Sequence, residues 1–222
     1  VYDVNSAQKV IDDRIAYLDA EFEAGINYLP NKADWLEGKW TGMVSAHGED
    51  RRGDTAVSSE LLSRIGTTMT TPPESLKLNS KLLRILKGRA ESISSGQNID
   101  WATAEHLAFG SLLLEGNPVR LSGQDSGRGT FSQRHSVFVD QFTEERYIPL
   151  ANLGPEQAMF EVIDSPLSEA SVMGFEYGFS QAEPNALVMW EAQFGDFANG
   201  AQVVIDQFIS SGEAKWLRMS GL

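Results

Sequence analysis

Three stretches of the chain hold side-chain types that could bind or activate a small molecule. Residues 123–135 combine three glycines with two arginines, a composition that could cradle an anion. Residues 164–169 end in Glu169, whose carboxyl group could transfer a proton. Residues 193–200 place two phenylalanines on either side of an acidic residue, and such aromatic rings could stack on a heterocycle.

Each stretch also has a purely structural interpretation, which the residues alone leave open. The glycine-rich stretch is not a P-loop, because the Gly-Lys-Ser/Thr ending is absent, and its arginines could simply pair with carboxylates. Glu169 is either a proton-transfer group or a carboxylate favoured by the positive end of a helix dipole. Phe194 and Phe197 are either core residues or aromatic partners of a ligand ring.

The three histidines, His47, His106 and His135, lack the spacing of metal ligands. His106 lies in the middle of a predicted helix, and we interpret it as structural. His135 follows Arg134 in the glycine-rich stretch and is the histidine that we consider for function. We predict no metal ligands within this chain.

From Asp100 onward, helices alternate with short apolar strands. We expect strands at 119–121, 160–163 and 186–190, the last of them an apolar run typical of a strand covered on both faces. The helices between and after them are expected at 101–115, with Asp100 as the cap, at 165–182 and at 201–210. This alternation predicts an α/β fold with a parallel sheet. Ligands bind beyond the carboxyl ends of such strands, so the three stretches above are predicted to meet along one edge.

Residues 1–97 are expected to form helices joined by irregular segments. The predicted helices run from a cap at Ser6 to about Tyr28, from Ser58 to a cap at Gly66, and over 78–92 with Leu82, Leu83, Ile85 and Leu86 buried. A Ser-Ser-Gly-Gln run at 94–97 marks the boundary. We therefore predict two domains, 1–97 and 98–222.

Two features of the second domain carry further expectations. Ala170, Gly174 and Gly178 recur every four residues, which predicts close packing of their helix against the sheet or another helix. Residues 216–222 are interpreted as the approach to a further strand, so the sheet is expected to be cut short at its C-terminus.

The composition excludes several classes of function. The 18 Lys and Arg against 31 Asp and Glu give a net charge of −13, which argues against binding to nucleic acid or to an anionic membrane. No apolar run is long enough to cross a bilayer. The absence of cysteine excludes disulfides, iron–sulfur clusters and thiolate catalysis.

Two long runs, 120–135 and 190–202, closely resemble the thiamine-dependent 2-oxoglutarate dehydrogenase family, as do 167–169 and 205–213. The resemblance is close from about Asp100 to the end and looser over residues 1–97. It implies a helical inter-domain segment followed by part of a transketolase-like, thiamine pyrimidine-binding domain.

The resemblance also implies roles for individual residues. Glu169 would hydrogen-bond the aminopyrimidine ring nitrogen of thiamine diphosphate, the step that activates the cofactor for decarboxylation of a 2-oxo acid. Phe197 would stack on the aminopyrimidine, with Phe194 as the alternative, and Gln193 is a weaker candidate for a polar contact. The family's Gly-Asp-Gly motif for Mg²⁺ is absent, so the ligands of Mg²⁺ are expected outside this chain.

By the same resemblance, the chain is expected to be an inactive internal part of a homodimeric enzyme. Its substrate would be 2-oxoglutarate, and its partner a lipoyl-bearing dihydrolipoamide succinyltransferase of the tricarboxylic acid cycle. The expected compartment is the cytoplasm of a bacterium or the mitochondrial matrix of a eukaryote. The alternatives are another thiamine enzyme (a branched-chain 2-oxo acid dehydrogenase or a transketolase) and a non-catalytic acidic α/β assembly module.

Overall fold

The structure is a computed structural model that describes residues 3–26, 37–44, 47–48, 52–166, 168–193 and 199–222. The chain divides into two compact units, Val1–Thr41 and Gly42–Leu222. Phe194 and Phe197 lie outside the described residues, so the expectations about them stay predictions. The domain boundary at residue 97 also stays a prediction.

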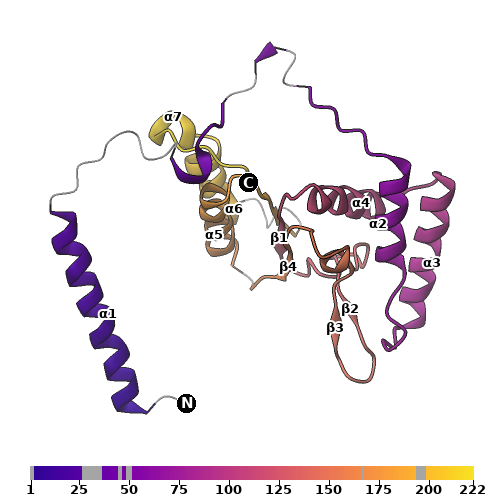
Figure 1. Ribbon diagram of the computed structural model, residues 1–222, viewed down its shortest axis with the longest axis horizontal. Helices are drawn as coiled ribbons and strands as arrows, with labels where there is room; N and C mark the ends of the chain where they lie inside the picture. The colour runs from indigo at the N-terminus through magenta and orange to yellow at the C-terminus, as the bar shows by residue number, and fades with distance from the viewer. Residues whose placement is uncertain (1–2, 27–36, 45–46, 49–51, 167, 194–198) are drawn as a thin grey trace. The chain divides into compact units, whose positions relative to one another are not determined.

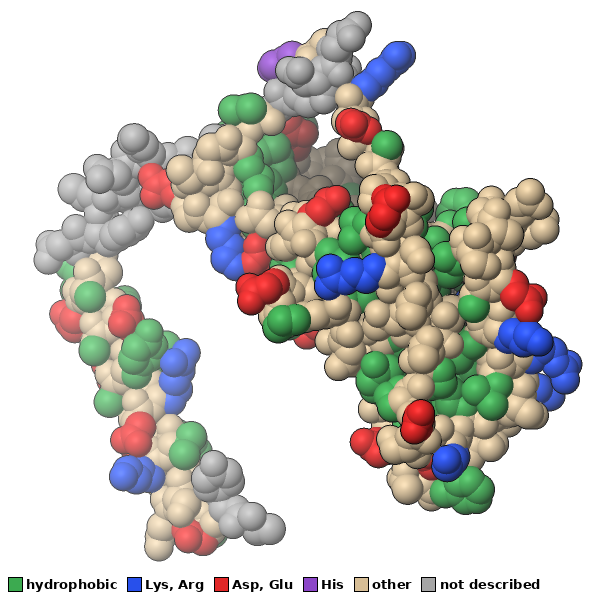
Figure 2. All heavy atoms as spheres, turned by 45° about the vertical axis from the view of Figure 1, so that its right-hand side comes forward, with side chains coloured by type: hydrophobic (Ala, Val, Ile, Leu, Met, Phe, Trp, Pro, Cys, Tyr) green, Lys and Arg blue, Asp and Glu red, His purple; other side chains and the backbone are tan. Residues whose placement is uncertain are grey.

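The first unit contains helix α1, Val4–Gly25, and a 3₁₀ turn at Gly38–Trp40. The cap of α1 is Asp3, whose Oδ1 accepts a hydrogen bond from the Ser6 backbone N–H at 2.8 Å. The prediction of Ser6 as the cap was therefore wrong, because the carboxylate of Asp3, three residues earlier, accepts the orphan N–H of Ser6. Figure 2 shows hydrophobic side chains between charged ones along this helix.

Three helices begin the second unit (Figure 1): α2, Ser59–Thr70; α3, Ser80–Ser95; and α4, Trp101–Leu114. The predicted caps Ser58 and Asp100 are confirmed, since each side chain accepts an N–H from the first turn of its helix. Gly66 is not a cap but lies inside α2, where an added Cβ would sit 2.7 Å from Ile93 Cγ2. Its small size lets α2 and α3 approach closely.

Two of the four residues expected on the buried side of α3 are wrongly assigned. Leu82 and Leu86 are buried, whereas Leu83 is 46% exposed and Ile85 is 36% exposed. The third buried residue of α3 is a charged one, Arg89. The face of α3 that is buried against α2 is therefore narrower than the apolar residues along this helix predict.

The predicted parallel sheet is confirmed. Its strands are β1, Val119–Gly123; β4, Phe160–Asp164; and β5, Leu187–Glu191, in the order β4-β1-β5. Gly123, at the carboxyl end of β1, is paired with Asp164 on one side and Glu191 on the other. The carboxyl ends of all three strands therefore lie at one edge. In β5 only Val188 is buried and its neighbours are half-buried, because β5 is an outer strand of this sheet.

The remaining helices are α5, Glu169–Ala182; α6, Asn199–Val204, continued by one π-helical turn at Ile205–Ile209; and α7, Gly212–Trp216. Helix α5 starts three residues later than predicted, with Ser168 instead of Ser165 at the cap position, and the Pro166 carbonyl accepts the Ser168 N–H. Residues 217–222 form no helix or strand, and the interpretation of 216–222 as the approach to a further strand stays a prediction.

A short hairpin, not foreseen from the sequence, joins β2, Phe138–Val139, to β3, Arg146–Tyr147. Asp140 closes its turn by accepting the backbone N–H groups of Phe142 and Thr143, and it also accepts the N–H of Lys77 at 2.6 Å. These backbone hydrogen bonds, with Lys77 first, lower the pKa of Asp140 to about 2. The carboxylate thereby links the hairpin to the segment that precedes α3.

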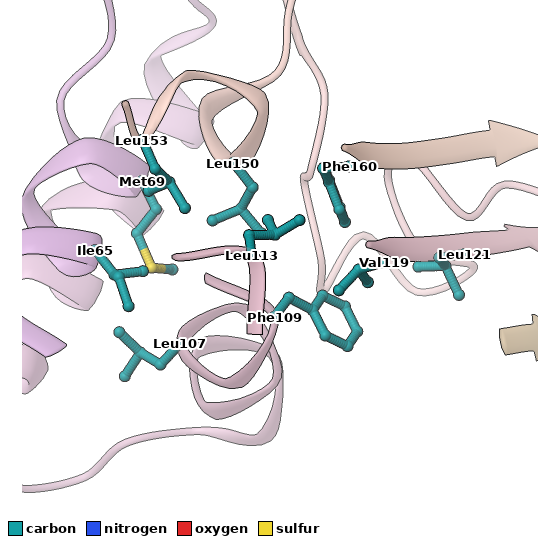
Figure 3. Close-up of a cluster of buried hydrophobic side chains, with 10 residues drawn as sticks. All are labelled: Ile65, Met69, Leu107, Phe109, Leu113, Val119, Leu121, Leu150, Leu153 and Phe160. Atoms are coloured by element: carbon teal, nitrogen blue, oxygen red, sulfur yellow. The ribbon is translucent and has the colours of Figure 1, made fainter. Parts of the chain in front are cut away.

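The largest hydrophobic core joins the helices to the amino ends of the strands. Figure 3 shows its buried side chains, which come from α2, α4, β1, β4 and the 3₁₀ helix Pro149–Asn152 with the residue that follows it: Ile65, Met69, Leu107, Phe109, Leu113, Val119, Leu121, Leu150, Leu153 and Phe160. At its centre, a Cβ on Gly110 would overlap Ile65 Cγ2, so α4 lies against α2 without room for a methyl group. This core holds the sheet and leaves its carboxyl edge free for the loops.

Candidate functional site

The three loops meet at the carboxyl edge of the sheet, as predicted. The Ser165 N–H donates to the Gly123 carbonyl at 2.9 Å, and the Gly127 N–H donates to Asp164 Oδ1 at 2.8 Å. Gln193 then links the loop after β5 to the loop after β1. These contacts place residues from distant parts of the chain in one site.

Glu169 is the first residue of α5 and is half-buried. An added Cβ on Gly200, near the start of α6, would lie 3.4 Å from both Cδ and Oε2 of Glu169. The Glu169 carboxyl group therefore covers the start of α6. Within the residues that the structure describes, this carboxyl group forms no hydrogen bond and no ion pair.

Gln193 uses its amide nitrogen to hold the glycine-rich loop. Its Nε2 donates to the Gln124 carbonyl at 3.2 Å and to Asp125 Oδ2 at 3.0 Å. The role predicted for Gln193, a polar contact to a ligand ring, would therefore fall to its amide oxygen. That role stays a prediction.

The arginines of the glycine-rich loop pair with carboxylates, which confirms the structural interpretation of that loop. Arg134 is 3% exposed and donates from Nη1 to Glu191 at 2.7 Å and from Nε to Glu105 at 2.8 Å. It thereby joins α4, the loop and the end of β5. Arg128 pairs with Asp125 at 3.1 Å on the surface.

The two histidines of this region differ as the sequence suggested. His106 is buried, and burial first of all lowers its pKa to about 4. Its Nδ1 donates to the Ala102 carbonyl at 2.7 Å, and its Nε2 bonds Ser136 Oγ at 2.9 Å, so it is structural. His135 is half-buried, and burial followed by the charge of Arg89 lowers its pKa.

A buried ion pair that sequence reasoning missed positions α5 on the sheet. Arg120 in β1 donates to both carboxylate oxygens of Glu176 in α5, at 2.7 and 2.9 Å, and to Glu161 in β4 at 2.7 Å. The hydrogen bond to Glu176 is the largest cause of the raised pKa of Arg120. The only sequence signal is an arginine inside an apolar strand, and its partner is 56 residues away.

The described part of the chain holds no group of three or more His, Asp or Glu side chains arranged to bind a metal ion. None of its helices combines the length and apolar character that crossing a membrane requires.

Open parallel sheets typically bind small molecules beyond the carboxyl ends of their strands. In this sheet, the side chain of Glu169 stands there without a partner among the described residues. The family of transketolase pyrimidine-binding domains matches residues 97–222, and the chain belongs to this family. The expected fold class is thereby confirmed.

The chain is also similar to the 2-oxoglutarate dehydrogenase E1 components of Brucella anthropi, Brucella canis and Brucella suis. It is 59% identical to each over 207 residues, which cover 92% of this chain and 21% of the relative. The resemblance to the 2-oxoglutarate dehydrogenase family is thereby confirmed. The chain spans about a fifth of the length of these curated relatives.

Proposed function

We propose that this chain forms the aminopyrimidine-binding part of a thiamine diphosphate-dependent 2-oxoglutarate dehydrogenase. The complete enzyme would decarboxylate 2-oxoglutarate oxidatively and pass the succinyl group to a lipoyl group. The observation that carries the proposal is the position of Glu169. Its carboxyl group stands at the carboxyl edge of the sheet, over Gly200, without a hydrogen-bond partner among the described residues.

The residues present fit one half of the cofactor. A carboxyl group without a partner can hydrogen-bond a ring nitrogen, and Gly200 leaves the space beside it free of a side chain. When bound, thiamine diphosphate supplies an electron sink for the loss of carbon dioxide from a 2-oxo acid. Glu169 would hold and move a proton at the ring nitrogen opposite the amino group, and Phe197, or in its place Phe194, would stack on the ring.

In this proposal, the residues that bind the diphosphate half of the cofactor lie outside this chain. A magnesium ion that neutralises the diphosphate needs oxygen ligands, and the described residues offer no cluster of them. The chain also lacks the Gly-Asp-Gly motif that the resemblance associates with Mg²⁺, so we propose that the Mg²⁺ ligands lie outside this chain. Residues 98–222 would form the start of the pyrimidine-binding domain, and residues 1–97 the segment that precedes it.

The exposed face of α5 supports a homodimer. Phe175 is 60% exposed, and an added Cβ on Gly174 or Gly178 would meet nothing within 4 Å. The close packing expected of these glycines is therefore not provided by this chain's own sheet. A second copy would cover this exposed face and bring its own cofactor half to Glu169.

The outside partners follow from the same proposal. A lipoyl-bearing dihydrolipoamide succinyltransferase would take the succinyl group, and the compartment would be the cytoplasm of a bacterium, since the Brucella relatives are bacterial. The net charge of −13 argues against a nucleic acid or an anionic membrane as a partner.

The function is tested with the full-length enzyme that carries this chain. We expect carbon dioxide release that requires thiamine diphosphate and is at least tenfold faster with 2-oxoglutarate than with branched-chain 2-oxo acids. Faster release from a branched-chain acid, or ketol transfer between sugars, would assign a different thiamine enzyme. No effect of the cofactor on activity or on thermal stability would leave the assembly-module alternative.

The role of Glu169 is tested by Glu169→Gln, which keeps the side-chain volume but cannot pass a proton. Exchange of the thiazolium C–H with deuterium on the bound cofactor should slow by about 10²–10⁴-fold. The matched control is Glu60→Gln, which removes another carboxylate from the first turn of a helix. Wild-type exchange in Glu169→Gln would refute the proton-transfer role, and a loss of folding instead would support the helix-dipole interpretation.

A further inference from the structure

A cavity of about 340 Å³ lies beside α3 and the connection to α4. Two arginines of α3 line it, Arg84 and Arg89, together with the open backbone at Gly88 and the side chain of Asn98. This volume is at the lower end of the range of about 300–1,000 Å³ that small-molecule sites occupy. The cavity is thus large enough for one small polar molecule.

Arg89 is an unusual buried cation. It is 4% exposed, and among the described residues its guanidinium forms one hydrogen bond, from Nη2 to the Gln133 carbonyl at 2.5 Å. Its buried Nε has no hydrogen-bond partner. Neither Arg84 nor Arg89 forms an ion pair in the described part of the chain, although the sequence has 31 acidic residues against 18 basic ones.

Buried guanidinium groups are normally paired, because removing a cation from water without a counter-charge is unfavourable. Burial accordingly lowers the pKa of Arg89, and the nearby charges of Asp100 and Glu105 offset this only in part. Each of the two carboxylates that line the cavity has another partner besides the charge of Arg89. Glu91 pairs with Lys87 at 3.9 Å, and Asp100 accepts the Thr103 N–H at 2.7 Å.

Gly88 opens the cavity to a ligand. An added Cβ at this position would meet nothing within 4 Å, so no packing contact in this chain requires a glycine there. Glycine is unfavourable in the interior of a helix relative to alanine. Its presence lets a ligand approach the helix backbone between the two arginines.

We propose that this cavity binds a small soluble oxyanion, a phosphate ester or a carboxylate, through the guanidinium groups of Arg84 and Arg89. Planar guanidinium groups match the oxygens of such anions in paired hydrogen bonds. Because Arg89 also holds the Gln133 carbonyl, a ligand on this residue contacts the side chain that anchors the glycine-rich loop. The site is therefore placed to connect an anionic effector with that loop.

The proposal is tested by equilibrium dialysis of the full-length protein with inorganic phosphate and, separately, with succinate. We expect one of the two to bind with a dissociation constant below about 10 mM, and the tighter one tells whether the natural ligand is a phosphate ester or a carboxylate. Arg84→Ala, which removes an exposed side chain, should weaken binding at least tenfold. Gly88→Glu, which places a carboxylate in the cavity, should abolish binding while helix content is retained.

The matched control is Lys81→Ala, which removes an exposed cation from the same helix outside the cavity. It should change the dissociation constant less than twofold. Equal weakening in Lys81→Ala and Arg84→Ala would show non-specific attraction and overturn the proposal. Binding to the isolated 222-residue chain but not to the full-length protein would also overturn it, because a carboxylate of the same polypeptide would then occupy the arginines.

Discussion

Acid should destabilise this protein through one buried histidine. His106 is 3% exposed and its pKa is about 4, against an ordinary value of 6.5, chiefly because of burial. The folded state therefore resists protonation more than the unfolded state does. Stability is present in full above pH 6.5 and is lost as the pH falls from 6.5 toward 4.

The pKa difference sets the size of the loss. The whole difference corresponds to about 3 kcal/mol, and the part lost between pH 7.5 and pH 5 is about 2 kcal/mol. The structural reason is that Nδ1 already donates to the Ala102 carbonyl, so Nε2 accepts the hydroxyl of Ser136. A proton on Nε2 removes that acceptor in a buried site.

The assay is urea unfolding of the 222-residue chain at pH 7.5 and pH 5, in the wild type, in His106→Gln and in His47→Gln. The His106→Gln variant should lose about 2 kcal/mol less between the two pH values than the wild type does. The His47→Gln variant, which alters an exposed histidine, should behave as the wild type. An equal loss in the wild type and in His106→Gln would refute the assignment.

The other predictions concern packing, cofactor stacking and completeness. Gly110→Ala, whose new methyl group would overlap Ile65, should lower the unfolding free energy by about 1–3 kcal/mol, whereas Gly174→Ala, which meets nothing, should not lower it in urea titrations. Phe197→Ala in the full-length enzyme should weaken thiamine diphosphate binding through lost stacking of about 0.5–1.5 kcal/mol; unchanged affinity with reduced thermal stability would make Phe197 a core residue. The 222-residue chain alone should release no carbon dioxide from 2-oxoglutarate, and measurable release would contradict the division of the cofactor site proposed above.

The features of this fold that depend on residues close together in the chain could be predicted from the sequence. Ser58 and Asp100 cap their helices because each stands directly before a helical segment and has a short oxygen-bearing side chain. The parallel order of the strands followed from the alternation of strands with helices. The meeting of the three loops then followed from strand direction alone.

The predictions that were wrong or missing concern features that depend on distant contacts or on very short strands. Gly66 resembles a helix cap in sequence, and only the approach of Ile93, 27 residues later, explains its place inside α2. The exposure of Leu83 and Ile85 depends in the same way on which face of α3 meets α2. The hairpin of β2 and β3 has strands of two residues each, too short for a periodic signal.

The candidate site combines both kinds of information. Glu169 could be chosen from its position after a strand and from its resemblance to a family, but its carboxyl group reaches Gly200 only because α5 is held on the sheet. Arg120 supplies that hold, since it lies in the central strand and bonds both oxygens of Glu176. Such a buried pair is directional, so it fixes where α5 lies along β1 in a way that apolar contacts alone would not. Glu176 is seven residues, two helical turns, beyond Glu169, so the same contact fixes the start of α5 beside the start of α6. The position of the acid that we assign to cofactor activation is thus set by an ion pair that takes no part in the chemistry.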